Sequence, residues 1–162
     1  MSYPPPLYHG EAGEASATIH TGREPDLVYP NGNRVTYLAT GADTGGLFGL
    51  YRWEFSEAVS GPGAHFHRTM SESFYILTGE VTVYDGRAWV PARPGDFLHV
   101  PPGGLHGFRN ESGAEASMLL HFAPGAPREG YFEGLDRRAR GEEWTEDDYD
   151  RFMAEHDNIW TS

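Results

Sequence analysis

Between residues 34 and 123 the chain is a succession of short segments rich in β-branched and aromatic residues, separated by turn-forming residues. Segments of this kind are typical of β-strands, and their spacing favours a barrel or sandwich over a helical bundle. Strands are predicted over residues 35–39, 47–55, 64–67, 74–77, 81–84, 88–90, 97–100, 107–109 and 117–122. Hairpin turns are expected at Thr78-Gly79-Glu80 and Asp85-Gly86, and Pro91 and Pro94 predict a loop before Gly95.

The segments on either side of this region have a different pattern. Residues 1–33 are rich in proline, glycine and polar residues and predict an irregular arm. Residues 124–162 predict a helical extension packed on the barrel, with a short helix near Tyr131 and a second one capped by Thr145, whose first turn is acidic. The second helix carries an apolar stripe that is either core packing or a substrate lid, formed by Tyr149, Phe152, Met153 and His156.

Composition excludes several classes of function. A chain of 162 residues is about one domain, and its net charge of −12 disfavours nucleic acid and anionic membrane surfaces. All 12 basic residues are arginine, which excludes Schiff-base lysines, and the absence of cysteine excludes thiolate nucleophiles, disulfides and cysteine-ligated metals. The N-terminus has no secretory pattern and no apolar run is long enough to span a bilayer, so a cytoplasmic protein is expected.

Two short segments carry four candidate metal ligands. Side chains alternate faces along a strand, so His65 and His67 point to the same side of theirs, and Glu72 follows across a short turn. His106 opens a strand after the turn Pro101-Pro-Gly-Gly. Three imidazoles and a carboxylate suit one divalent ion of Fe, Mn, Ni, Co, Cu or Zn and leave positions for substrate or dioxygen. The alternative is that these histidines are ordinary core or surface residues.

The spacing of these segments resembles the two motifs of the cupin superfamily. The first reads His-x-His, four residues, Glu, six residues, Gly, and ends at Gly79. It departs from the family only at its start, where Val59 stands in place of a glycine and Gly61 and Gly63 lie nearby. The second motif matches at every position, with Gly95, Pro101, Gly103, His106 and Asn110. The resemblance implies an all-β, cupin-type antiparallel β-barrel (jelly roll) over residues 34–123, with one divalent transition metal held by His65, His67, Glu72 and His106.

Within the superfamily the chain looks most like single-barrel members similar to quercetin dioxygenases. This weaker resemblance rests on Ser73–Glu80, Gly95–Gly103, His106–Asn110, the Phe122-Ala-Pro-Gly exit and the closing Met153–Trp160. It implies a dioxygenase acting on a small aromatic or enolic substrate. Two alternatives stay open: a redox-neutral isomerase, cyclase or decarboxylase, and a non-catalytic module that binds a small molecule.

Residue roles follow from the same reasoning. Glu72 is the only acid in the predicted site and is a candidate catalytic base as well as a ligand. Phe74 shares strand parity with Glu72, and Phe108 shares it with His106, so both are candidate substrate-binding residues together with Tyr51 and Trp53. Core packing is the alternative for all four. The sequence does not determine whether His99 and His121 face into the barrel or outward.

The resemblance also implies a homodimer, because cupins commonly pair through barrel faces.

Overall fold

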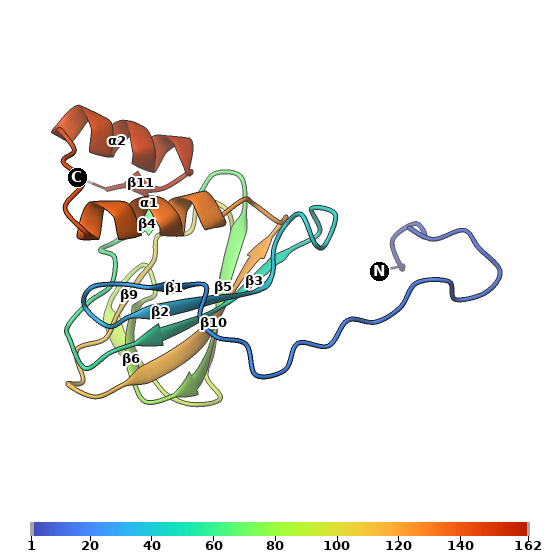
Figure 1. The fold of residues 1–162 in the computed structure, drawn as a ribbon, viewed down its shortest axis with the longest axis horizontal. Helices are drawn as coiled ribbons and strands as arrows, with labels where there is room; N and C mark the ends of the chain where they lie inside the picture. The colour runs from blue at the N-terminus through green and yellow to red at the C-terminus, as the bar shows by residue number, and fades with distance from the viewer. Residues whose placement is uncertain (1, 162) are drawn as a thin grey trace.

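A computed structural model describes residues 2–161, and its strands form two antiparallel layers that face each other (Figure 1). The larger sheet has six strands in the order β1-β2-β3-β10-β5-β8. Their bounds are Leu27–Val28 (β1), Arg34–Ala39 (β2), Gly49–Phe55 (β3), Ala116–Ala123 (β10), Ser71–Thr78 (β5) and Phe97–Val100 (β8). Every pairing in this sheet is antiparallel, which gives one face to the core and leaves the other outward.

The facing layer is assembled from two smaller sheets. One has the order β7-β6-β9, over Trp89–Ala92, Val81–Tyr84 and Gly107–Arg109, and the other pairs β11 with β4, over Ile159–Trp160 and His65–Phe66. A two-way backbone bridge between His65 and His106 connects them at the start of β9. The layer therefore runs β7-β6-β9-β4-β11, with the C-terminal strand at its outer edge.

Alternation along the long strands builds the core. In β3 the residues Gly49, Tyr51, Trp53 and Phe55 are buried, and the residues between them are half-buried on the other face. β10 alternates in the same way, so its Met118, Leu120 and Phe122 also point inward. Phe108 of the facing layer lies 5.3 Å from Phe74 and 6.1 Å from Phe55 between ring centroids. The interior is thus filled by aromatic contacts between the two layers.

Two helices, α1 (Glu129–Ala139) and α2 (Glu146–Glu155), lie together over one end of the barrel, whereas the N-terminal arm runs away from it (Figure 1). Thr145 accepts a hydrogen bond from the backbone N–H of Asp148, and the Asp148 side chain accepts one in return, which forms the N-terminal capping box of α2. The apolar stripe of α2 faces α1, since the Phe152 and Tyr131 rings stack at 5.9 Å. Within residues 2–161 no helix is both long and apolar enough to cross a bilayer.

The all-β fold with a helical C-terminal extension is confirmed, with local differences. Pro91 was expected in a loop but lies inside β7, which is an edge strand where a missing N–H costs no ladder hydrogen bond. The predicted irregular arm contains the short strand β1, which extends the larger sheet beside β2. The strand β11 was not predicted.

Candidate metal centre

Backbone pairing brings His65 and His106 together. The His65 N–H donates to the His106 carbonyl at 2.8 Å, and the His106 N–H donates to the His65 carbonyl at 2.9 Å. Residues that exchange two hydrogen bonds across antiparallel strands present their side chains on the same face. The two imidazole centroids are accordingly 4.4 Å apart.

Close packing at Gly61 explains the displaced glycine of the first motif. Gly61 has φ +140°, and a Cβ there would lie 2.1 Å from the carbonyl oxygen of Phe108. The loop before His65 can approach β9 this closely only without a side chain. Gly61 therefore allows the contact between the two ligand-bearing segments.

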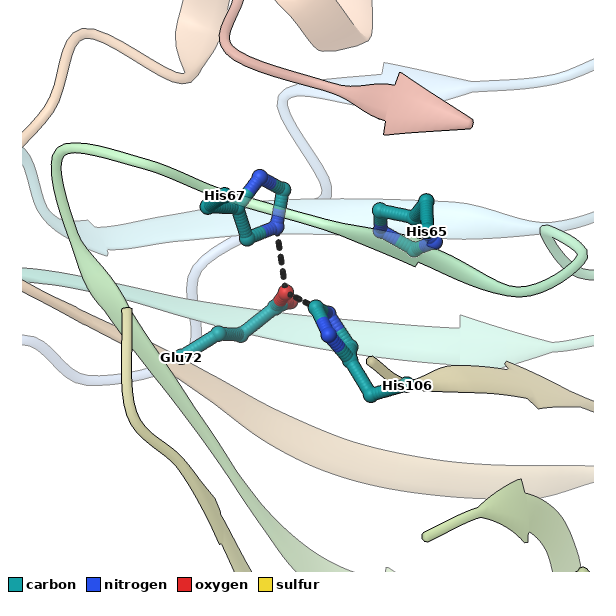
Figure 2. A group of neighbouring side chains, drawn as sticks. All are labelled: His65, His67, Glu72 and His106. Atoms are coloured by element: carbon teal, nitrogen blue, oxygen red, sulfur yellow. Dashed lines mark hydrogen bonds and ion pairs between the residues drawn. The ribbon is translucent and has the colours of Figure 1, made fainter. Parts of the chain in front are cut away.

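His67 and Glu72 complete the cluster from opposite layers. His67 follows β4 on the same face as His65, and the turn Arg68-Thr69-Met70 then leads into β5, where Glu72 points inward opposite Val100 and Phe122. Figure 2 shows the Glu72 carboxylate reaching up between His67 and His106. Its Oε2 lies 2.9 Å from His67 Nε2 and 2.8 Å from His106 Nε2.

The structure thus brings all four predicted ligands together. One potential ligand atom from each lies within 4.8 Å of the others, and each residue is at most 3% exposed. Such deep burial of a carboxylate costs free energy unless charge or hydrogen bonds compensate it. The arrangement is that of a binding centre between the two layers.

Each imidazole is oriented by a backbone carbonyl at its Nδ1. His65 Nδ1 donates to Gly63 at 2.9 Å, His106 Nδ1 donates to Gly104 at 2.9 Å, and His67 Nδ1 donates to Asp157 at 2.6 Å. A carbonyl can only accept, so Nδ1 carries the proton of each neutral ring and Nε2 keeps its lone pair. This is the usual outer-sphere arrangement of metal-binding histidines.

The donor set fits a divalent cation. With Nδ1 protonated, two Nε2 lone pairs face the Glu72 oxygen, and three acceptors in contact repel one another unless a proton or cation lies between them. Three imidazole nitrogens and one carboxylate suit the first-row divalent metals.

The pKa values of the cluster depend on burial and on Glu72. Burial and the neighbouring His106 lower the pKa of His65 to about 4, so His65 is a neutral donor near pH 7. Burial alone would lower the pKa of His106, but the hydrogen bond to Glu72 outweighs it and the pKa is raised. Burial likewise opposes ionisation of Glu72, yet its close contacts with the Nε2 atoms of His106 and His67 hold its pKa below the usual range. A proton on His106 Nε2 therefore lies between His106 and Glu72, where a bound cation would otherwise compensate the charge of the carboxylate.

Two of the predicted substrate-binding residues lie beside the cluster. The Phe74 ring centroid is 5.9 Å from that of His106, and Phe108 packs against Phe74. Both rings are buried. They form the apolar wall next to His106, and a role in binding substrate stays a prediction.

Tyr51 and Trp53 lie farther from the ligands. Tyr51 packs edge-on against Phe122, which is itself 6.4 Å from His67 between centroids, and its hydroxyl donates to the Glu129 carboxylate. Trp53 packs among Tyr29, Phe55 and Phe132. These contacts join α1 to the barrel, and a substrate contact of either residue stays a prediction.

The remaining histidines of the strands face outward. His99 Nδ1 lies 3.0 Å from the Ser73 hydroxyl, and the His121 ring stacks on Phe48 at 5.5 Å. Both border a groove of about 470 Å³ on the outer face of the six-stranded sheet. A separate open pocket of about 240 Å³ between β8 and β6 includes His106 in its wall.

Sequence reasoning did not identify the C-terminal residues that contact the ligands. Asp157 holds His67 through its carbonyl, and the Trp160 ring lies 5.2 Å from that of His65. One signal was available, because Asp157-Asn158 follows the end of a predicted helix and these residue types tolerate left-handed backbone. The contact between His67 and Asp157, however, joins residues 90 positions apart, so no local sequence pattern reveals it.

The sequence and the fold of the chain are similar to those of known cupins. The sequence profile of the cupin domain matches residues 52–122, which include all four ligands. Similar solved structures include an RmlC-like cupin from Shewanella frigidimarina, with a TM-score of 0.57 and 20% identity over 72% of this chain and 96% of that one. The polyketide cyclase RemF from Streptomyces resistomycificus gives a TM-score of 0.54 and 23% identity over 67% and 80% of the two chains.

Several curated proteins have a higher sequence identity to this chain, but over only part of its length. The chain is 40% identical to quercetin 2,3-dioxygenase of Bacillus subtilis over 48 residues, 30% of this chain and 14% of that enzyme. It is 34% identical to polyketide synthase CurC of Streptomyces cyaneus over 58% of each chain.

The match with protein SchB of Streptomyces halstedii is longer. Identity is 33% over 64% of this chain and 77% of that protein. The chain thus spans about a seventh of the dioxygenase and just over half of CurC. With the profile match, the jelly-roll fold and the His/His/Glu/His cluster, these findings show that the chain belongs to the cupin superfamily.

Proposed function

We propose that this protein is a metal-dependent enzyme that binds a small aromatic or enolic substrate through an enol or phenol oxygen and uses dioxygen as co-substrate. The observation that carries the proposal is the convergence of three carbonyl-oriented imidazoles and one carboxylate at a buried point between the two layers. A divalent ion bound there would act as a Lewis acid that lowers the pKa of an enol or phenol, and a redox-active ion would couple that oxygen to dioxygen.

The protein's own residues supply the holding groups and a proton acceptor. His65, His67 and His106 would hold the ion as neutral donors and leave positions for other ligands. Glu72 stays ionised through the neutral range because its pKa is lowered. Its carboxylate is therefore ionised and in place to accept the proton of a substrate hydroxyl beside it, and a bound ion would favour this transfer by lowering the pKa of that hydroxyl.

The surroundings of the cluster favour a flat, apolar substrate. Phe74 and Phe108 form a continuous aromatic wall on the His106 side, and Phe122 lies on the His67 side. Aromatic rings bind a planar substrate by stacking or edge contacts and keep water from the reacting oxygen. Tyr51 and Trp53 support this wall from the α1 side, where they would affect substrate binding through packing.

A second candidate is redox-neutral ring closure, in which the metal acts only as a Lewis acid. The match to the quercetin dioxygenase has the higher identity, 40%, but covers only 48 residues. The match to CurC covers 95 residues, and CurC is called a polyketide synthase. Polyketides are rich in enolisable carbonyl groups, so both candidates begin with an enol or phenol oxygen at the metal.

Oxygen dependence separates the two candidates. Protein loaded separately with Fe, Mn, Ni, Co, Cu and Zn would be offered flavonols and aromatic polyketides, with oxygen uptake and product mass recorded in air and under argon. The proposal expects uptake of dioxygen and incorporation of ¹⁸O from ¹⁸O₂ with a redox-active metal. Equal turnover under argon, or full activity with Zn, would favour ring closure instead.

Glu72→Gln tests the proton acceptor. The amide keeps the size of the side chain and a carbonyl oxygen but has no basicity near neutral pH, so turnover per bound metal should fall by about a hundredfold or more. Metal content is measured beside the rate, so that loss of the ion is not counted as loss of the base. Wild-type turnover in metal-loaded Glu72→Gln would leave Glu72 as a ligand only.

A further inference from the structure

One of the three ligand histidines depends on a distant part of the chain. The carbonyls that orient His65 and His106 belong to Gly63 and Gly104, each two residues earlier in the same loop. The carbonyl that orients His67 belongs to Asp157, at 2.6 Å and 90 residues away. The local loops alone therefore fix two ligands and leave the third to the C-terminal segment.

Asp157 also holds the turn that joins two ligands. Its carboxylate accepts hydrogen bonds from the backbone N–H groups of Arg68 and Thr69, at 2.9 and 2.8 Å, and from the Thr69 hydroxyl at 2.7 Å. Arg68 and Thr69 lie between His67 and Glu72. The single residue Asp157 thus contacts the ligand ring by its main chain and the ligand-bearing turn by its side chain.

The backbone of Asp157 is suited to this double contact. Its φ is +56°, the one positive φ of a non-glycine residue among residues 2–161. Aspartate and asparagine tolerate this left-handed conformation better than most residues, whereas alanine does not. The conformation turns the chain from α2 into β11 and presents the carbonyl to His67.

The neighbouring residues of the segment are also anchored. The buried Arg128 donates a hydrogen bond to the His156 carbonyl at 2.7 Å. The two residues of β11, Ile159 and Trp160, pair with Phe66 and His65 of β4. The Trp160 ring also lies against the His65 ring. Residues 156–158 thus lead from α2 into β11, which is the outer strand of the ligand-bearing layer.

We propose that Asp157 is a positioning residue of the metal centre and that the C-terminal segment, residues 156–160, completes the site by fixing the tautomer and orientation of His67. The proposal rests on the metal-binding part of the proposed function. Outer-sphere partners of this kind change metal affinity by about 10–100-fold when they are lost.

Point variants of the full chain test this role. Asp157→Ala removes the carboxylate and disfavours the positive φ, Asp157→Gly removes only the carboxylate, and Asp157→Asn keeps the backbone preference and one acceptor oxygen. Zn²⁺ affinity is measured by competition with a chromophoric chelator, and the His67 tautomer is read from long-range ¹H–¹⁵N spectra of the metal-free protein at pH 8. Asp150→Ala, an exposed acid of α2, is the matched control.

We expect Asp157→Ala to bind Zn²⁺ about 10–100-fold more weakly and to lose the single Nδ1-protonated tautomer of His67. Asp157→Gly should lie between Ala and wild type, Asp157→Asn should be nearest to wild type, and Asp150→Ala should match it. If Asp157→Ala lowered the Tm but left the Zn²⁺ affinity and the His67 tautomer unchanged, Asp157 would only stabilise the fold. That result would overturn the proposal. Failure of the wild-type protein to bind Zn²⁺ or any other divalent metal would instead overturn the metal centre itself.

Discussion

At the scale of single residues, the ligand set could be predicted because its information is local. His65 and His67 share a face by strand alternation, and the turn before His106 fixes where that strand begins. The partner of His67 Nδ1 could not be predicted, because Asp157 reaches it only after the whole chain has folded. Chemistry carried by adjacent residues is readable in a sequence, whereas an outer-sphere contact depends on tertiary structure.

The raised pKa of His106 predicts how pH affects metal binding. The hydrogen bond to Glu72 keeps His106 protonated to a higher pH than an ordinary histidine, and this proton must leave before Nε2 can bind a metal. Apparent affinity should therefore weaken by about tenfold per pH unit as the pH falls below that pKa. His65, with a pKa of about 4, adds proton competition only in strong acid.

Chelator competition with Zn²⁺ at pH 6, 7 and 8 checks this expectation. A His106→Ala control removes the proton together with the ligand and should bind weakly with a flatter pH profile. Affinity that is constant from pH 8 to pH 6 in the wild-type protein would contradict the assignment.

At the scale of elements, strands of four or more residues were predictable, whereas the two-residue edge strands β1 and β11 were not. Tyr51, Trp53 and Phe55 alternate clearly along β3, and this face is buried as expected. β1 and β11 have two residues each, too few to show alternation, and each is defined only by its pairing with a neighbour, β1 with β2 and β11 with β4. Pro91 looked like a loop residue because a single sequence does not reveal which strand lies at an edge.

The aromatic contacts of Phe132 should hold α1 on the barrel. Its ring lies 5.2 Å from Tyr51, 5.8 Å from Trp53 and 6.3 Å from Tyr37 between centroids, and Phe132 is buried. Phe132→Ala removes these contacts and leaves a cavity, so the free energy of unfolding should fall by about 3–5 kcal/mol.

Urea denaturation measures the change in the free energy of unfolding, with Val59→Ala as control. Val59 is 72% exposed and lies outside the groove of the larger sheet, so its truncation should change stability by less than about 0.5 kcal/mol. A loss of under 1 kcal/mol in Phe132→Ala would mean that α1 is held by other contacts.

At the scale of the whole molecule, the homodimer stays a prediction, and we propose the outer face of the six-stranded sheet as the face that pairs. Tyr75 and Phe97 are exposed beside the groove that His99 and His121 border. Sheets that face water normally carry polar residues on that side, and an apolar patch of this kind is typical of a protein interface. The sequence indicated pairing but not the face, because strand parity alone does not tell which side of a sheet is covered.

Light scattering at micromolar concentration should give twice the chain mass of 18.0 kDa. Introducing a charge at this face, as in Phe97→Glu, should shift the protein toward the monomer, whereas Val59→Glu, at an exposed loop residue outside the groove, should not. A wild-type monomer would contradict the prediction.

The metal content of the purified protein and of its ligand variants tests the central claim most directly. Untagged protein is analysed by inductively coupled plasma mass spectrometry beside His65→Ala, His67→Ala and His106→Ala, with His20→Ala, at an exposed residue of the N-terminal arm, as control. About one divalent metal per chain is expected in the wild type and the control, with loss in each of the three variants, because the remaining ligands cannot replace a missing imidazole. Full metal occupancy in any one of the three variants would contradict the centre described here.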